Sequence, residues 1–546
     1  MLAEIGFVLA MVAVVVAVGR AAHWTGLPDA VLLTVVGLVY AFLPGPNLRL
    51  QPDLVLDLVI PPLLYQAALG SSLLALRSRL RTVVSLSVVL VLVTALVTGG
   101  LLAWLVPAVP LAAGMALGAA VAPSDPVAAL AVGRTVGLPA KLSTLIEGEG
   151  LLNDATALTI FEVAVAAAVG GGFSAGRAAG TFVLAAAGGL AIGAAVAWLV
   201  QLLRRVFPDP LSVNAVSLAT PFGAYAAGTA AHVSGVLAVV VAGLILGHQN
   251  PRLQTGASRL QAAAVWRLVN FLLEGFVFLL IGEQLPVVVG GLHAYGAGTV
   301  AAAAAVTVGT VLAVRPSWLL LTQHVPRWLH SRLGGEDAEG AEGGERPDSG
   351  QPLSGAEVTA LSWAGTRGVI TLAAAFAIPV TIRAGHGFPA RDLLLFLAYL
   401  VVLITLLGEG LTFGPVLRRL GLRADPADLA RLRNEARVAA VEAALGRLDQ
   451  MAGEKDLPAT VTSDLRRTLA ARLNRYRGRL AFLDENPGTP RSAGYDAAVR
   501  ARRALIDAEH EELLRWRDAG RLPDESLRVL QRELDHEERT LPIPPP

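Results

Sequence analysis

The first 420 residues of the chain alternate between long apolar runs and short polar connections. Only helices and closed barrels satisfy every backbone hydrogen bond inside lipid, and a helix needs about 20 apolar residues to cross it. The pattern therefore predicts an all-α polytopic membrane protein of about 13 transmembrane helices. The apolar runs fall near residues 2–20, 27–44, 54–75, 82–106, 110–132, 142–170, 177–203, 211–231, 234–248, 260–287, 294–320, 356–381 and 391–416.

Composition adds a second region to this picture. The chain has 546 residues, of which 54% are hydrophobic, more than an ordinary soluble domain carries. About half of its charged side chains lie in residues 423–546, which hold 22 basic and 22 acidic residues. We therefore expect a transmembrane domain over 1–422 and a helical cytoplasmic regulatory tail over 423–546. Four amphipathic helices are predicted in this tail, near 427–451, 463–484, 494–518 and 524–540.

The connections give an orientation. Those after odd-numbered runs hold thirteen Lys and Arg residues and those after even-numbered runs hold four. Because basic residues stay on the cytoplasmic side, the N-terminus is expected outside and the tail inside the cell inner (cytoplasmic) membrane. A Gly- and acid-rich stretch over 324–355 predicts a disordered cytoplasmic loop. The net charge of +1 gives no reason to expect nucleic-acid binding, and without cysteine no Cys-based metal site is possible.

Two of the predicted spans look interrupted. The fifth contains Ala122-Pro-Ser-Asp-Pro-Val127, whose two prolines disfavour helix, and the twelfth contains Ala364-Gly-Thr-Arg-Gly-Val369, with two glycines. Unwound backbone at membrane depth is tolerated only beside protein or a watery cavity. Two breaks seven spans apart suit inverted repeats, in which two broken helices cross at a binding site.

Ionisable side chains gather at the same depth. In span six, Glu149 and Asn153 stand one helical turn apart, and Asp154 follows. At a rise of 1.5 Å per residue, Asp125, Asp154 and Arg367 lie about 16–22 Å along their spans, near the bilayer centre. A charge there costs about 2.5–3.5 kcal/mol on insertion scales. A structural polar knot between helices is one interpretation, and an ion site is the one we favour.

The residue types indicate which ion. A buried arginine needs a counter-charge, and we expect Glu149 to pair with Arg367. Asp154 and Asp125 would then hold a monovalent cation, because hard cations prefer oxygen ligands. Removal from water favours the protonated form of a carboxylate, so Na⁺ and H⁺ would compete for Asp154. The cation ligands are predicted to be Asp154, Asp125, Ser124 and Asn153, with Glu274 and Thr366 as candidates for supporting them.

Several stretches resemble the monovalent cation:proton antiporter 1 family, which contains the bacterial NhaP-type antiporters and the animal Na⁺/H⁺ exchangers. They are Pro61–Leu69, Pro123–Val127, Glu147–Thr156, Ser234–Gly243, Glu274–Gly282 and Trp363–Gly368. The resemblance implies a 13-span inverted-repeat fold, a homodimer and electroneutral exchange of Na⁺ for H⁺, serving pH and sodium homeostasis. It makes Asp154 the cation and proton carrier, supported by Asp125, Ser124, Asn153, Glu149 and Arg367. Gly150 departs from the family, which commonly has serine there, and this leaves the choice among Na⁺, Li⁺ and K⁺ open.

Other functions remain as alternatives. A K⁺/H⁺ antiporter of the same fold would share every feature above, and a cation channel would share the spans without proton coupling. An intramembrane enzyme or an ATP-driven pump is disfavoured, because the chain has neither His-Glu-x-x-His nor a P-loop lysine. The sequence thus predicts a secondary transporter, not an enzyme, that needs no cofactor beyond the Na⁺ and H⁺ it moves.

Overall fold

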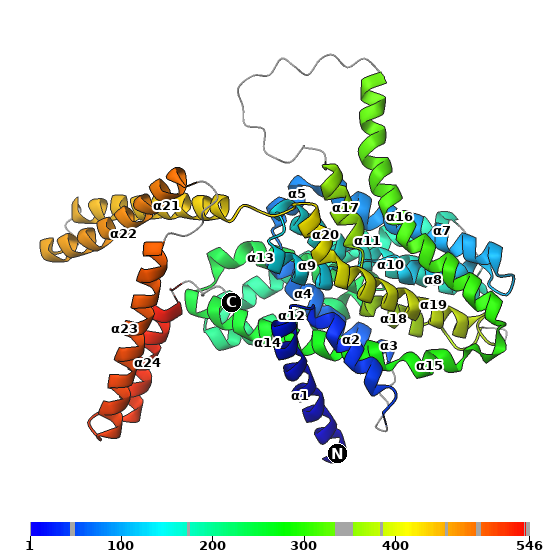
Figure 1. Ribbon diagram of the computed structural model, residues 1–546, viewed down its shortest axis with the longest axis horizontal. Helices are drawn as coiled ribbons and strands as arrows, with labels where there is room; N and C mark the ends of the chain where they lie inside the picture. Colours follow the sequence, from blue (N-terminus) through cyan, green and yellow to red (C-terminus); the bar gives the residue numbers. More distant parts are fainter. Residues whose placement is uncertain are drawn as a thin grey trace. The chain divides into compact units, whose positions relative to one another are not determined.

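Helices make up nearly all the regular structure in the computed structural model of the chain (Figure 1). The structure describes residues 2–43, 50–171, 175–332, 353–382, 386–453, 457–486, 493–539 and 541. Apart from an isolated antiparallel bridge between Thr381 and Gly387, these residues form helices and their connections. The all-helical class predicted from the apolar runs is confirmed.

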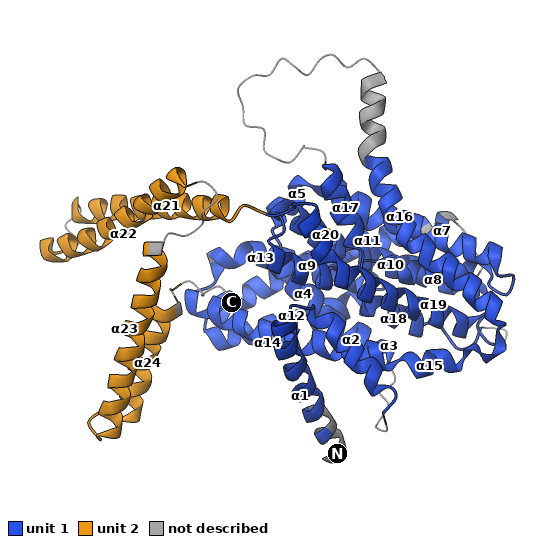
Figure 2. Ribbon diagram, viewed as in Figure 1, with its two compact units in different colours: residues 1–423 blue, residues 424–546 orange. Residues whose placement is uncertain are grey.

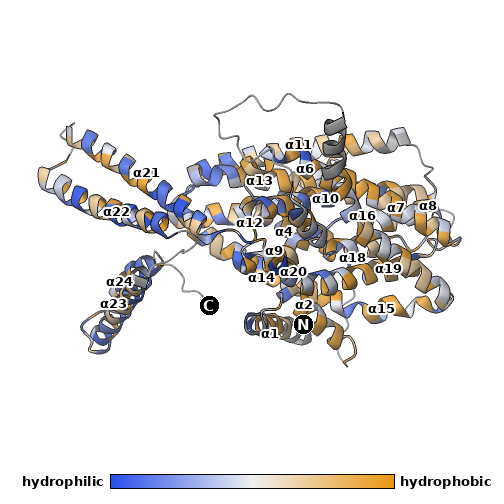
Figure 3. Cartoon of the chain, turned by 45° about the horizontal axis from the view of Figure 1, so that its top comes forward, coloured by the Kyte–Doolittle hydropathy of each residue, from blue (hydrophilic) through white to orange (hydrophobic). Residues whose placement is uncertain are grey.

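The chain divides into two compact units, Met1–Arg423 and Ala424–Pro546 (Figure 2). This division coincides with the place where charged residues become frequent in the sequence. Figure 3 shows the same change, with hydrophobic residues dominating the helices of the first unit and hydrophilic residues spread over those of the second.

The helices of the first unit follow the predicted apolar runs. In chain order they are α1 (Leu2–Thr25), α2 (Asp29–Tyr40), α3 (Pro52–Leu54), α4 (Ile60–Gly70), α5 (Leu73–Ser78), α6 (Leu80–Val84), α7 (Leu90–Leu105), α8 (Leu111–Val121), α9 (Pro126–Val136), α10 (Ala140–Ala166), α11 (Ala175–Val206), α12 (Pro210–Ala230), α13 (Gly235–Leu253), α14 (Gly256–Glu283), α15 (Leu285–Gly290), α16 (Ala297–Arg332), α17 (Gly355–Trp363), α18 (Val369–Phe376), α19 (Arg391–Ile404) and α20 (Gly410–Arg419). Short π-helical turns join several of them: η1 (Val55–Val59), η2 (Ser85–Val89), η3 (Ala167–Gly171) and η6 (Thr405–Glu409).

Length and hydropathy mark many of these elements as membrane spans. Among the described residues, eight helical segments are long and apolar enough to cross a bilayer, and three shorter apolar helices accompany them. The shorter ones are Leu9–Thr25, Asp29–Tyr40 and Gly235–Pro251. The total of 13 spans stays a prediction.

Both predicted interruptions are present. The helix α8 ends at Val121 and α9 begins at Pro126, while α17 ends at Trp363 and α18 begins at Val369. In the first break, proline stands at the first position of α9, where its missing N–H costs nothing. In the second, a capping box formed by Ser354 and Glu357 starts α17.

One boundary differs from the sequence expectation. The helix α16 continues to Arg332, so it takes up the first nine residues of the loop predicted over 324–355. Most of the remaining loop, residues 333–352, lies outside the described residues. The extended C-terminal segment predicted at 542–546 also lies outside them.

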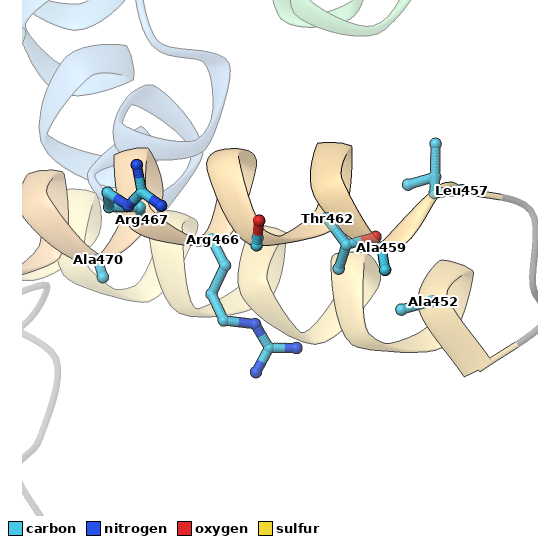
Figure 4. A pocket seen from close by; sticks show the side chains of 8 residues that line it. Ala452, Leu457, Ala459, Thr462, Arg466, Arg467 and Ala470 are labelled. Atoms are coloured by element: carbon cyan, nitrogen blue, oxygen red, sulfur yellow. The ribbon is translucent and has the colours of Figure 1, made fainter.

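The second unit consists of two helical hairpins. In the first, α21 (Pro426–Gly453) packs along α22 (Ala459–Glu485), and in the second, α23 (Ala493–Asp518) packs along α24 (Asp524–Arg539). Exposed ion pairs cross both hairpins, such as Arg477–Glu442 in the first and Arg502–Glu537 in the second. A surface hollow of about 540 Å³ lies beside the first turns of α22 and the end of α21 (Figure 4). All four helices match the predicted amphipathic segments within a few residues.

Candidate functional site

The two helix breaks meet in the interior of the first unit. The backbone N–H of Asp125, in the first break, donates to the carbonyl oxygen of Thr366, in the second, over 2.6 Å. The Thr366 hydroxyl donates back to the carbonyl oxygen of Asp125 over 2.7 Å. Polar groups released by one unwound segment are thus satisfied by the other, which answers the need for partners that breaks at membrane depth create.

Asp125 is fixed where the breaks cross. Its carboxylate caps α9 by accepting from the backbone N–H of Val127 over 2.9 Å. The same carboxylate lies against the α-carbon of Gly368, where an added β-carbon would come within 2.7 Å of the Asp125 carboxyl carbon. Only glycine fits at position 368, so the second break positions an acid of the first.

Asp154 lies on α10, the long helix that packs against α8, α9 and α4. Its side chain is 5% exposed, and its nearest electrostatic neighbour is Asp125. The described residues give its carboxylate no hydrogen bond or ion pair. A carboxylate that is buried without donors binds either a proton or a cation to offset its charge.

A cavity of about 300 Å³ connects this carboxylate with the surface. Asp154, Asp125 and Gly368 line its inner end, and Ser71 and the exposed Arg134 line its outer part. The half-buried Glu274 on α14 also lines it, one turn from Asn270, whose amide donates to Gln66 over 2.7 Å. Glu274 thus lines the same cavity as the two aspartates, and Thr366 is hydrogen-bonded to the backbone of Asp125.

A network of polar contacts connects the first break with α10 and α16. Arg315 on α16 forms a two-pronged ion pair with Glu149, one prong measuring 2.9 Å. Ser124 donates its hydroxyl to Glu149 over 2.6 Å, and Asn153 donates its amide to the carbonyl and hydroxyl oxygens of Ser124. The amide oxygen of Asn153 is buried and accepts no hydrogen bond from the described part of the chain. The four residues Glu149, Asn153, Ser124 and Arg315 thus tie α10 and α16 to the first break.

The predicted pairing of Glu149 with Arg367 is wrong. Arg367 is buried, but its guanidinium donates to backbone carbonyl oxygens: Val121 over 3.0 Å, Ala122 over 3.5 Å, and Gly365. These carbonyls lie at or beside the two breaks, where the helical hydrogen-bond ladder stops. The unwound backbone therefore supplies acceptors for Arg367, while Glu149 is paired with Arg315.

Gly150 is also explained by packing. A β-carbon at this position would lie 2.6 Å from Cγ and 2.7 Å from Cδ of Pro126. A proline ring cannot swing away as a flexible side chain does, so a serine here would push against the start of α9. The space that a serine side chain would need at position 150 is occupied by the ring of Pro126.

Sequence reasoning missed two buried charges. Arg315 stands alone in the apolar part of α16, and Glu409 stands in η6 between two apolar helices. The insertion cost that singled out Glu149 and Asp154 applies equally to both. A search for every charged residue inside an apolar run would have found them.

No cluster of three or more His, Asp or Glu able to hold a metal ion occurs in the described part of the chain. Asp154 and Asp125 place two carboxylates beside one cavity. Such a pair, at the crossing of two broken helices and beside a cavity, suits a transporter site.

Comparison with known proteins places the chain among transporters. The family profile described as "Sodium/hydrogen exchanger, transmembrane" matches residues 10–419. An uncharacterised Na⁺/H⁺ exchanger of Mycobacterium tuberculosis is 31% identical over 540 residues, covering 97% of this chain and 95% of that protein. A sodium, potassium, lithium and rubidium/H⁺ antiporter of Bacillus subtilis is 30% identical over 517 residues, covering 92% of this chain and 73% of that protein.

A solved structure agrees in fold. The sodium proton antiporter MjNhaP1 from Methanocaldococcus jannaschii superposes with a TM-score of 0.56 at 20% identity, covering 77% of this chain and 99% of that one. At this identity the likeness concerns the fold alone. Together with the profile, which spans the helices that build both breaks and the cavity, the comparisons identify this chain as a member of the sodium/hydrogen exchanger family, a family of transporters.

Proposed function

We propose that this protein exchanges Na⁺, or another monovalent cation, for H⁺ across the cell membrane. The observation that carries the proposal is the placement of Asp154: buried, without a protein partner, and lining a cavity where two broken helices cross. The membership of the chain in a family of exchangers and the buried carboxylate of Asp154 both support exchange of a cation for a proton.

The exchange follows from the cost of an empty site. An ionised carboxylate deprived of water is strongly disfavoured, so Asp154 holds either a proton or a cation while the site changes sides. Asp125 adds a second carboxylate, and the unpartnered amide oxygen of Asn153 adds a neutral ligand. The Ser124 oxygens complete the oxygen-rich surroundings that a hard monovalent cation requires. One site that must always be filled couples the two ions.

The range of cations is proposed to extend beyond Na⁺. The Bacillus subtilis relative carries the name of a sodium, potassium, lithium and rubidium/H⁺ antiporter. In this chain Gly150 offers no side-chain oxygen and Pro126 occupies the space beside it. K⁺ and Li⁺ are therefore tested together with Na⁺, and a K⁺/H⁺ antiporter remains the alternative within the same fold.

We base the proposed orientation of the protein in the membrane on the distribution of Lys and Arg residues, and its proposed assembly on the family. If the odd-numbered connections are cytoplasmic, Arg134 and the outer part of the cavity face the cytoplasm, and the described structure is open inward. The N-terminus then lies outside the inner membrane and the helical tail inside. We propose further that the protein works as a homodimer, with the tail in a regulatory role, in sodium and pH homeostasis.

Electroneutral exchange is the proposed stoichiometry. The helix α10 carries the pair Asn153 and Asp154, so one carboxylate alternates between one proton and one monovalent cation. A net charge moved per cycle would couple transport to the potential by about 2.3 kcal/mol per charge per 100 mV. Exchange rates in vesicles clamped at zero and at about −100 mV by valinomycin should therefore agree when the driving ion gradients are held equal.

Inside-out vesicles with a preset pH gradient test the main proposal. Addition of Na⁺, Li⁺ or K⁺ should dissipate the gradient, and Asp154→Asn should abolish this dissipation at equal protein level. The matched control is Glu162→Gln, which neutralises an exposed acid two turns further along α10 and should preserve exchange. Undiminished exchange by Asp154→Asn, or no cation response by the unaltered protein, would overturn the proposal.

A further inference from the structure

Glu409 is a buried acid to which the mechanism above gives no role. It ends the π-helical turn η6 between α19 and α20, and it is 8% exposed. Its oxygen Oε2 is buried and has no hydrogen-bond partner among the residues that the structure describes. Burying an ionised acid in the membrane-spanning unit costs free energy unless an opposite charge lies nearby. An ionised Glu409 therefore calls for positive charges around it.

The surroundings of Glu409 are cationic. Its electrostatic neighbours are Arg367 and Arg315, together with the backbone of Gly365 in the second break. The same π-helical turn also contacts Arg367 directly, because the Thr405 hydroxyl accepts from the Arg367 backbone N–H over 3.0 Å. The turn η6 therefore presents both a hydroxyl and a carboxylate to the second break.

Arg367 needs a counter-charge other than the cation ligands. Arg315 is neutralised by its ion pair with Glu149, whereas the hydrogen bonds of the Arg367 guanidinium among the described residues go to backbone carbonyl oxygens. Asp154 and Asp125 are the proposed cation ligands, so a negative charge of theirs that offsets Arg367 is lost to the cation. A buried arginine therefore calls for a further carboxylate nearby.

We propose that Glu409 is the fixed counter-charge of Arg367, and that it acts as a positioning residue which lets the two aspartates hold a cation. With Glu409 ionised, Arg315, Arg367, Glu149 and Glu409 sum to zero, and Asp154 with Asp125 determines the local potential. Without it, one positive charge would repel the transported cation. The inference rests on the proposed function, since it concerns the affinity for the ion that Asp154 carries.

Na⁺-driven proton movement by purified protein in liposomes tests this, with KM for Na⁺ and the maximal rate measured separately. Two charges about 10 Å apart, at an effective dielectric constant of about 20, interact strongly enough to change an affinity on the order of tenfold. Glu409→Gln should therefore raise KM about tenfold and change the maximal rate by less than about twofold. Glu409→Asp, which keeps the charge, should keep KM close to that of the unaltered protein. Asp392→Asn removes an exposed acid from the first turn of α19 and should leave both values unchanged.

A second readout does not depend on transport. A bound cation stabilises the folded protein in proportion to its affinity, so the upward shift of Tm that Na⁺ causes should be smaller in Glu409→Gln than in Glu409→Asp. Equal KM and equal Na⁺-induced shifts in Glu409→Gln and the unaltered protein would overturn the inference, as would a raised KM in Glu409→Asp. Should Glu409→Gln fail to fold, the Glu409→Asp values decide alone. Failure of the unaltered protein to exchange would instead contradict the proposed function.

Discussion

Ion pairs occur in both units of this protein, but in opposite surroundings. In the membrane unit, Arg315 and Glu149 have side chains that are 4% and 3% exposed. In the tail, Arg477 and Glu442 lie 2.7 Å apart with side chains that are 57% and 47% exposed. The buried pair has two contacts and the exposed pair has one, but the larger difference between them is burial.

Burial changes how much an ion pair contributes to the stability of the fold. Removing two charges from water is expensive, and their attraction offsets that cost only when each finds the other. On the tail surface, water competes with either partner, and the attraction is screened by salt. The buried pair therefore makes each partner dependent on the other, while the exposed pair contributes mainly to the solubility and register of a hairpin.

Breaking the buried pair should have the largest effect. Arg315→Ala leaves the Glu149 charge buried and alone, which typically costs about 3–5 kcal/mol. We expect a marked loss of monodisperse protein on size-exclusion chromatography and a large fall in Tm. The measurement is thermal unfolding in detergent, at the same protein concentration for each variant.

The double variant sharpens this prediction. Combining Arg315→Met with Glu149→Gln removes both charges, so it should be more stable than Arg315→Met alone, and the difference measures the coupling. Arg367→Lys serves as the comparison, because the Arg367 guanidinium hydrogen-bonds to backbone carbonyl oxygens instead of to Glu149. Additive losses from Arg315→Met and Glu149→Gln would contradict an energetically coupled pair.

The choice of partner is the point at which sequence reasoning failed. Glu149 and Arg367 stand at similar depth, and nothing in the apolar periodicity says which spans are neighbours. The prediction also assumed that a buried arginine requires a carboxylate. It overlooked the carbonyls of Val121 and Gly365, which become available as acceptors because the helices stop beside them.

Features set by local sequence were predictable. Proline and glycine disrupt helices wherever they stand in the chain, so the breaks around Asp125 and Thr366 could be placed. The four tail helices follow from apolar periodicity bounded by breakers such as Pro458 and Gly520. The closeness of Asp154 to Asp125 was inferred from equal depth, and the cavity that both residues line agrees with it.

A neutral substitution at the site should have an intermediate effect. Gly150→Ser brings a β-carbon within 2.6 Å of the Pro126 ring, and overpacking of this kind typically costs about 1–3 kcal/mol. We expect a lower Tm and slower cation exchange, since the start of α9 carries Asp125. Adding Pro126→Ala should recover part of the lost Tm, and a Gly150→Ser protein as stable as the unaltered one would show that α9 can shift freely.

The smallest effect is expected in the tail, and it completes the comparison. Arg477→Ala removes a partner that water replaces, so the cost should be about 0.2–1 kcal/mol. Because exposed charges are screened, the difference in Tm from the unaltered protein should shrink when the salt concentration rises from about 0.05 M to about 1 M. The loss caused by Arg315→Ala should hardly change over the same range, because lipid and protein keep ions away from Glu149. Equal salt dependence of the two losses would mean that burial does not separate the two pairs, and the contrast between the units would have to be explained by geometry.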